Sequence, residues 1–180
     1  MEVRRLKEKL PNYLLKRVAD GIFMSLIRYA LPLYCPVQFE VEDPKPGSID
    51  KLKKTFNDCI RLLTGNTLKD HKPIKDMLQE LGWLSINQLA VETRLVEAWK
   101  IAHVEGYCLK DTLNSRHKSS YNTRSNQVTY FHHSEDGRFT SFANRTAKVW
   151  NKAPKDIKEA ITLSQAKIRI GGFVNSEIPI

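Results

Sequence analysis

The sequence lacks the residue patterns on which most active sites depend. Its three cysteines and five histidines form no Cys-x2-4-Cys or His-x3-5-His pair, so we expect no metal site. It contains neither a Gly-x-Ser-x-Gly elbow nor a glycine loop followed by Lys-Ser, and none of its aspartates are adjacent to each other. We therefore predict a protein without catalytic residues and without a cofactor.

Long apolar runs are scarce as well. Residues 21–37 form the best candidate, but they are fewer than the roughly 20 that span a bilayer core, and they include Arg28 and two prolines. We interpret this stretch as a buried helix of a soluble protein. Because no apolar leader follows the first basic residues and the cysteines are odd in number, we expect an intracellular protein, in nucleus or cytoplasm.

Apolar residues recur at helical spacing along much of the chain. A composition of 41% hydrophobic and 27% charged residues is typical of a folded domain. A three-to-four spacing near the N-terminus predicts a long helix that Pro11 bends or splits. The expected buried stripe consists of Leu6, Leu10, Leu14, Val18, Ile22, Leu26, Tyr29 and Leu33.

Turn and capping residues divide the middle of the chain into three further helices. Ser48 precedes a helix that runs to about Thr64, and Pro73 begins a short helix that Gly82 closes. Ser85 and Gln88 have the form of a capping box, which opens a helix to about Val104. Because little of its circumference is polar, we expect this last helix to lie at the centre of the core.

The amino-acid composition changes after residue 113. Residues 114–133 contain no acidic residue and many Ser and Asn, which is typical of a loop, and the alternation around Asp136-Gly137 allows a small β-hairpin. A Trp150-Asn-x-x-Pro154 corner follows, and a second capping box at Thr162 starts a last helix. We expect an apolar face across the corner, made of Val149, Trp150, Ala153, Ile157, Ala160 and Ile161.

These patterns predict a mainly α protein, a helical bundle with a small β-hairpin before the C-terminal helices. We divide it into a helical region over residues 1–113, a basic polar loop or hairpin over 114–137, and a C-terminal helical segment over 138–180. Trp83, Trp99 and Trp150 are assigned to packing. Asp70 and His71 stand before a helix, where an aspartate more often caps and a histidine is more often solvated.

Positive charge is the most informative feature. The chain has 29 Lys and Arg against 20 Asp and Glu, and residues 138–170 alone contain eight basic and two acidic residues. Such an excess favours a polyanionic partner, although a lysine run is often only a solvated helix face. The predicted contacts to phosphates of RNA or DNA are Arg116, Lys118, Arg124, Arg145, Lys148, Lys152, Lys155 and Lys158.

The order of motifs resembles the C-terminal end of the reverse transcriptase of LINE-class (non-LTR) retrotransposons of the jockey-like group. Three stretches carry most of the resemblance: Asn-x-x-Ile-Arg-Leu-x-x-Gly, Leu-Gly-Trp-Leu and Trp-Asn-x-x-Pro-x-x-Ile. The matching positions are Asn57, Arg61, Gly65, Asp70, His71, Leu81, Gly82, Trp83, Leu84, Trp150, Asn151, Pro154 and Ile157.

This resemblance implies a helical thumb and post-thumb region that grips an RNA template. It also implies that the polymerase aspartates and the endonuclease of such an element would lie before Met1, so the chain would be catalytically inert alone. Two departures are visible: Ala166 stands where the family often has Phe, and Gly171-Gly172 fall where its last helix usually continues. A shortened or loosened final helix is expected from these departures.

Three functions remain open from the sequence. The first is binding of RNA or DNA through the basic residues, and the second is a helical protein-interaction module that docks a partner through exposed apolar surface. The third is a retroelement remnant with no cellular role. We expect no membrane association, and the sequence leaves the oligomeric state and the choice between RNA and DNA undetermined.

Overall fold

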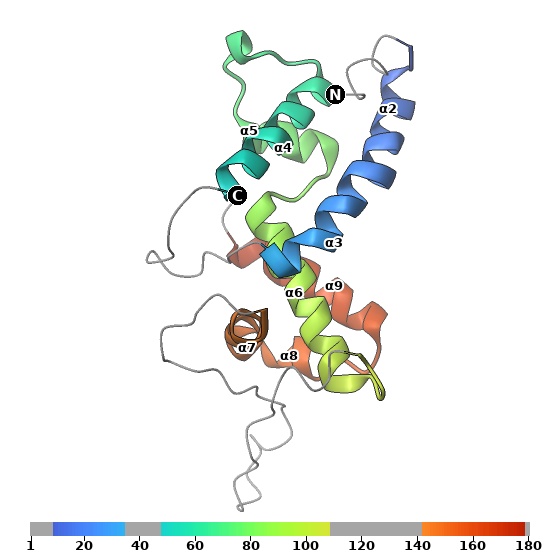
Figure 1. Ribbon diagram of the computed structural model, residues 1–180, viewed down its shortest axis with the longest axis vertical. Helices are drawn as coiled ribbons and strands as arrows, with labels where there is room; N and C mark the ends of the chain where they lie inside the picture. Colours follow the sequence, from blue (N-terminus) through green and yellow to red (C-terminus); the bar gives the residue numbers. More distant parts are fainter. Residues whose placement is uncertain (1–8, 35–47, 109–141, 179–180) are drawn as a thin grey trace, which may run out of the picture. The chain divides into compact units, whose positions relative to one another are not determined.

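The computed structural model describes residues 9–34, 48–108 and 142–178. These residues are mainly helical and include no strand, which confirms the predicted fold class (Figure 1). They form two compact units, one made of the described residues up to Leu89 and the other of those from Ala90 onward. The loop or hairpin predicted over residues 114–137 lies outside the described residues, so that division of the chain stays a prediction.

The first unit contains the N-terminal helices and the beginning of the longest one. A π-helical turn and a 3-10 turn interrupt its α-helices. In chain order the elements are α2 (Asn12–Val18), η1 (Ala19–Phe23), α3 (Met24–Tyr34), α4 (Ser48–Thr64), η2 (Leu68–Asp70), α5 (Ile74–Leu81) and the first turn of α6 (Ile86–His103).

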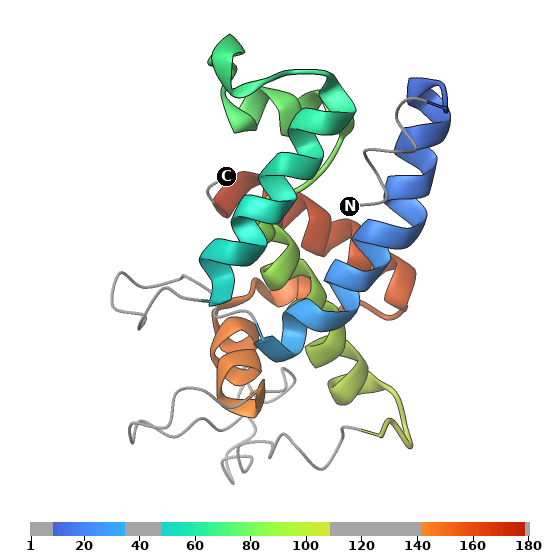
Figure 2. The same cartoon turned by 45° about the horizontal axis from the view of Figure 1, so that its top comes forward.

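Of the two predicted effects of Pro11, a bend or a split, the structure shows no bend: Pro11 caps the start of α2, and residues 1–8 lie outside the described residues. The backbone N–H groups of Leu14 and Leu15 donate to the Pro11 carbonyl at 3.0 and 3.1 Å. One continuous helical segment begins there and contains α2, the π-helical turn η1 and α3; it is blue in Figure 2. Proline fits this position because it has no N–H to donate and its φ angle already suits a helix start.

The predicted stripe is wrong at Ile22, Leu26 and Tyr29. Leu10, Leu14 and Val18 are half-buried, whereas Leu6 and the side chain of Leu33 are not among those that the structure describes. The side chains that are buried are Leu15, Ala19, Met24, Ile27 and Leu31. Ala19 and Met24 are five residues apart because η1 is a π-helical turn, which places one extra residue in the turn and shifts the buried side of everything after it. Ile22, Leu26 and Tyr29 are left 62%, 65% and 82% exposed.

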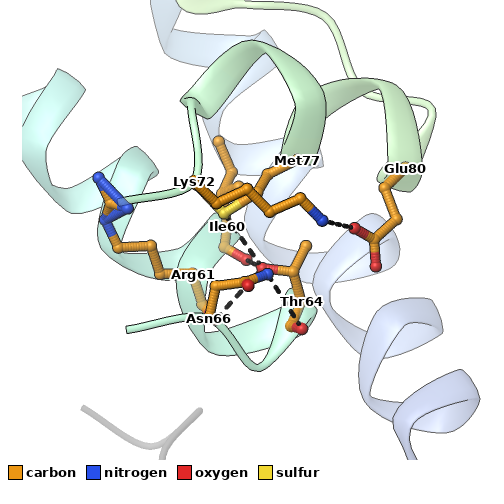
Figure 3. A network of polar contacts seen from close by, with 7 residues as sticks. All are labelled: Ile60, Arg61, Thr64, Asn66, Lys72, Met77 and Glu80. Atoms are coloured by element: carbon orange, nitrogen blue, oxygen red, sulfur yellow. Dashed lines mark hydrogen bonds and ion pairs between the residues drawn. The ribbon is translucent and has the colours of Figure 1, made fainter. Parts of the chain in front are cut away.

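Helices α4 and α5 have the predicted bounds and pack against each other. Gly65 and Gly82, which follow them, have positive φ angles of 75° and 65°, where a residue without a side chain is favoured. Figure 3 shows the end of α4 beside α5: the Thr64 hydroxyl donates to the Ile60 carbonyl at 3.0 Å and lies 3.3 Å from the Met77 sulfur. In the same view, Lys72 is ion-paired with Glu80 at 2.7 Å.

Three aromatic rings form the centre of the first unit. Phe56 lies 6.2 Å from Phe23 and 5.8 Å from Trp83 between ring centroids, and all three rings are stacked. The Trp83 indole N–H donates to the Asp20 carboxylate at 2.6 Å, and the other oxygen of that carboxylate is 2.8 Å from the Lys16 ammonium. The π-helical turn that contains Asp20 is therefore fixed to Trp83, the second residue after α5.

The capping box at the start of α6 is confirmed. The Ser85 N–H donates to the Gln88 side chain at 3.0 Å, and the Gln88 N–H donates to the Ser85 hydroxyl at 3.2 Å. Buried residues occur around most of the α6 circumference, as predicted, and they include the fully buried Arg94. The helix ends at His103, one residue before the predicted end.

The second unit is built around the remainder of α6. Its further helices are α7 (Phe142–Lys152), α8 (Lys155–Lys158) and α9 (Leu163–Glu177). The final helix is not shortened at the two glycines, because α9 continues through Gly171 and Gly172. A helix interior accepts glycine at a cost of only about 1 kcal/mol relative to alanine, and the loosening expected as the alternative stays a prediction. The predicted burial of Ile161 is wrong. Ile161 is 85% exposed, since it lies in the connection that precedes the Thr162 cap of α9.

Candidate nucleic-acid interface

Helix α7 has one buried side and one basic side. Thr146, Ala147, Val149 and Trp150 are buried, and all but Val149 are fully so. These positions recur within an arc of the helix, which is how an amphipathic helix packs on a core. The helix contains no acidic residue.

Three predicted phosphate contacts lie on the other side of α7. Arg145, Lys148 and Lys152 are three and four residues apart, so they share a face of the helix opposite Trp150. Arg145 and Lys148 are half-buried, and Lys152 is exposed. We call these three residues together with Lys155, which is exposed at the first position of α8, the α7–α8 basic face.

The Trp-Asn-x-x-Pro corner connects the two helices of this face. The Ala153 N–H donates to the carbonyls of Val149 and Trp150, both at 3.1 Å, and ends α7. Pro154 then takes an extended conformation with φ −56° and ψ 153°, and α8 begins at the next residue. Because proline fixes its φ angle and lacks an N–H, it ends one helix and begins the next within a short space.

Aromatic rings hold this corner against the last turns of α6. The Trp99 ring stacks on His103 at 4.6 Å, and His103 meets the edge of Trp150 at 6.4 Å between centroids. The Trp99 indole N–H donates to the Ala160 carbonyl, just after α8, at 3.1 Å. Trp83, Trp99 and Trp150 are all buried, which confirms their assignment to packing.

Lys158 does not suit the phosphate contact that the sequence predicts. Its side chain is only 5% exposed, and its ammonium donates to the Asn151 carbonyl at 3.0 Å. That carbonyl belongs to the last turn of α7, where carbonyls have no N–H donor within the helix and a positive charge is favourable. Burial, and secondarily the charge of Lys155, lower the pKa of Lys158. Lys158 therefore connects α8 to the end of α7 on the buried side of the corner.

The remaining charges near the corner limit the size of the basic face. Asp156 and Glu159 are the acidic residues of this segment, and both are exposed. The Arg169 guanidinium donates to the Asp156 backbone carbonyl, which ties α9 to α8. Lys100 of α6 is paired with Glu97 at 2.8 Å and is not part of the face. Arg116, Lys118 and Arg124 lie outside the described residues, so their roles stay predictions.

The first unit contains a small pocket that the sequence patterns did not predict. Its volume is about 250 Å³, and α4, α5 and the first turn of α6 surround it. The lining residues are Lys53, Phe56, Asn57, Ile74, Lys75, Leu78, Ser85, Ile86 and Asn87. One sequence feature could have indicated this pocket: Lys53 and Asn57 are polar residues one turn apart on α4, on either side of the buried Phe56.

Metal ligands and membrane-spanning helices are the other features that would point to a function. Among the described residues, no three His, Cys, Asp or Glu side chains gather closely enough to hold a metal ion. Within the same residues, no helix has both the length and the apolar character that a membrane crossing requires. The chain matches no protein-family model, no curated protein and no solved structure.

Proposed function

We propose that this protein binds RNA or DNA through the α7–α8 basic face, by sequence-tolerant contacts to phosphates. The observation that carries the proposal is the division of α7 into a buried apolar side and a side with Arg145, Lys148 and Lys152 and no acid. Lysine and arginine side chains on one face of a helix match the charge that a nucleic acid strand presents.

Rigidity of the face supports the same function. A contact surface loses less entropy on binding when its backbone is already held. Here the Trp99, His103 and Trp150 rings and the Lys158 ammonium hold the corner between Lys152 and Lys155 from its buried side. The four cations are therefore presented on helices whose packing does not depend on the ligand.

The resemblance to LINE-class reverse transcriptases gives the proposal its biological setting. We propose that the chain is a non-catalytic, thumb and post-thumb fragment of a retrotransposon RNA-directed DNA polymerase. Its motifs fall at structurally meaningful positions: Gly82 ends α5 with a positive φ angle, and Trp150 and Ile157 are fully buried on either side of the corner. On this proposal the chain acts inside the cell and retains template binding without polymerisation.

The test is binding of a labelled RNA hairpin followed by fluorescence anisotropy. Reversing three charges in Lys148/Lys152/Lys155→Glu should weaken binding by at least tenfold, since like charges would then face the phosphates. The matched control is Lys51/Lys54/Lys69→Glu, which makes the same change in net charge at three exposed lysines of α4 and η2. Equal losses in the two variants would show that only net charge matters, and would contradict the proposed site.

A protein-interaction module is the second candidate, and one observation favours it. Ile22, Leu26 and Tyr29 are exposed and are spaced four and three residues apart along η1 and α3, which is the anchor spacing of a helix that docks into a groove. Apolar docking of this kind depends little on salt, whereas phosphate contacts weaken steeply as salt rises. A partner whose binding is insensitive to salt and is lost in Leu26→Asp would support this candidate.

A further inference from the structure

The pocket of the first unit combines an apolar floor with a polar rim. Phe56, Leu78 and Ile86 are buried and form the floor. Lys53, Asn57 and Asn87 are half-buried at the rim, and Lys75 is exposed there. With about 250 Å³, the pocket is somewhat smaller than the 300–1,000 Å³ typical of sites for drug-sized ligands. Its occupant is therefore a compact molecule, or one unit of a longer one.

The electrostatics of the pocket favour an anionic group. Two lysines and no acidic residue are among the nine residues that line it. Ser85, Ile86 and Asn87 bring the N-terminal end of α6, an 18-residue helix. The Ser85 hydroxyl caps the Gln88 N–H, whereas the N–H groups of Ile86 and Asn87 have no acceptor within the helix. The positive end of the helix dipole thus adds to the charges of Lys53 and Lys75.

The rim also supplies hydrogen-bonding groups that a simple anion would not use. Each asparagine amide offers a carbonyl acceptor and an NH₂ donor, the pair of groups that reads the edge of a nucleobase. In the part of the chain that the structure describes, the side chains of Lys53, Asn57, Lys75 and Asn87 make no hydrogen bond or ion pair. Their polar groups are available to a ligand.

We propose that this pocket binds one nucleoside monophosphate unit. The phosphate lies between Lys53 and Lys75, and the base lies over Phe56, Leu78 and Ile86 with its edge against Asn57 and Asn87. Inorganic phosphate would satisfy the lysines alone, and an acyl chain with a carboxylate would leave the amides without partners, which is unfavourable once water is displaced. A nucleotide satisfies both sets of groups together.

The same chemistry has two sources, a free nucleotide and an unstacked nucleotide of a single strand. The pocket is formed within the first unit and shares no residue with the α7–α8 basic face. The proposal therefore stands or falls separately from the proposed function. If the nucleotide belongs to a strand, the two sites would contact different positions of the same nucleic acid.

Nuclear magnetic resonance of the full chain labelled with ¹⁵N tests the proposal, because the side-chain amides of Asn57 and Asn87 and the indole N–H of Trp83 give separate signals. The probes are the four nucleoside 5′-monophosphates, the matching nucleosides, inorganic phosphate and a ten-nucleotide single-stranded RNA. We expect the monophosphates to shift both amide signals, and to bind at least tenfold more tightly than either inorganic phosphate or the nucleosides. The RNA arm shows whether a nucleotide within a strand produces the same shifts.

Variants assign the signals to the proposed contacts. Lys53→Gln/Lys75→Gln should weaken nucleotide binding at least tenfold, whereas Lys51→Gln/Lys69→Gln, the same change at exposed lysines outside the pocket, should leave it within twofold of the unaltered protein. Asn57→Ala should weaken nucleotides but not inorganic phosphate. The α7–α8 variant Lys148/Lys152/Lys155→Glu should retain the shifts from free nucleotides, even if it no longer binds RNA.

Three results would overturn the proposal. The first is the absence of shifts with any monophosphate at millimolar concentration. The second is equal affinity for inorganic phosphate and for nucleotides, which would reduce the pocket to an anion site. The third is an equal loss in the pocket variant and its lysine control. Loss of RNA binding in the α7–α8 variant alone bears on the proposed function and leaves this inference intact.

Discussion

Replacing Lys158 by Met separates a structural role from a binding role at one position. The sequence places Lys158 among the phosphate contacts, but the residue is only 5% exposed and its ammonium donates to the Asn151 carbonyl at 3.0 Å. Methionine keeps an unbranched apolar side chain in the corner and removes only the charged donor. We therefore expect Lys158→Met to lower stability and to leave RNA affinity nearly unchanged.

The magnitude follows from two opposing contributions. A hydrogen bond from a charged donor contributes about 1.5–3 kcal/mol to stability, and removing it weakens the end of α7. Part of that loss in stability is offset, because methionine avoids the cost of desolvating an ammonium group. The expected net loss is about 1 kcal/mol in the free energy of unfolding at pH 7.

The pH dependence of the unfolding free energy provides a second, independent test of the role of Lys158. Burial and the charge of Lys155 lower the pKa of Lys158 in the folded state below its ordinary value of 10.5. Between these two pKa values the unfolded chain binds more protons than the folded one, so this residue contributes more stability as pH rises. The difference in unfolding free energy between the unaltered protein and Lys158→Met should therefore increase toward pH 10.5 and then level off.

Urea unfolding at several pH values, combined with RNA anisotropy at neutral pH, measures both effects. Lys152→Met is the matched control because Lys152 is exposed on α7: it should change stability by no more than about 0.5 kcal/mol and should weaken RNA binding. A Lys158→Met protein that is fully stable but binds RNA as weakly as Lys152→Met would refute the structural role of Lys158. So would a stability difference that shrinks as pH rises.

Three other substitutions and one chemical measurement probe the packing. Gly82→Ala should destabilise by about 1 kcal/mol or more because φ is 65° there, whereas Gly171→Ala, with no atom near its added Cβ inside α9, should stabilise by about 0.5–1 kcal/mol in thermal unfolding. Thr146→Val should be neutral or stabilising by up to about 1 kcal/mol in urea, because the buried Thr146 hydroxyl has no hydrogen-bond partner among the described residues. Burial raises the pKa of the Cys59 thiol to about 11, so alkylation at pH 8 should modify the exposed Cys108 long before Cys59; equal rates would contradict the burial of Cys59.

Local signals predicted the middle of the chain well. The ends of α4 and α5 follow from Gly65 and Gly82, and the start of α6 follows from the reciprocal hydrogen bonds of Ser85 and Gln88. In each case the physical cause lies within a few residues of the boundary: a positive φ angle or an unsatisfied first-turn N–H group. Sequence spacing alone is sufficient for such features.

The N-terminal stripe could not be predicted in the same way. Spacing of three and four assumes an uninterrupted α-helix, but η1 is a π-helical turn that moves the buried side from Ala19 to Met24. Its position depends on contacts distant in sequence, including the hydrogen bond from the Trp83 indole to Asp20. No residue type near Asp20 indicates a π-helical turn on its own.

The candidate site also combines features that local sequence predicts with features that depend on contacts distant in sequence. The basic face of α7 followed from the spacing of Arg145, Lys148 and Lys152 within one helix. The burial of Lys158 did not, because it depends on how the corner returns α8 toward the end of α7. The pocket was also hidden from the sequence, since α4, α5 and α6 each contribute only part of its lining.

The salt dependence of binding to a ten-nucleotide single-stranded RNA tests the central claim most directly. For a single strand, the logarithm of the binding constant falls with the logarithm of salt concentration with a slope of about −0.7 for each phosphate neutralised. Four contacts, from Arg145, Lys148, Lys152 and Lys155, predict a slope of about −2.8, and Lys148/Lys152/Lys155→Gln should reduce it to about −0.7. A slope that is the same in the unaltered protein and in the Lys148/Lys152/Lys155→Gln variant would contradict binding through the α7–α8 basic face.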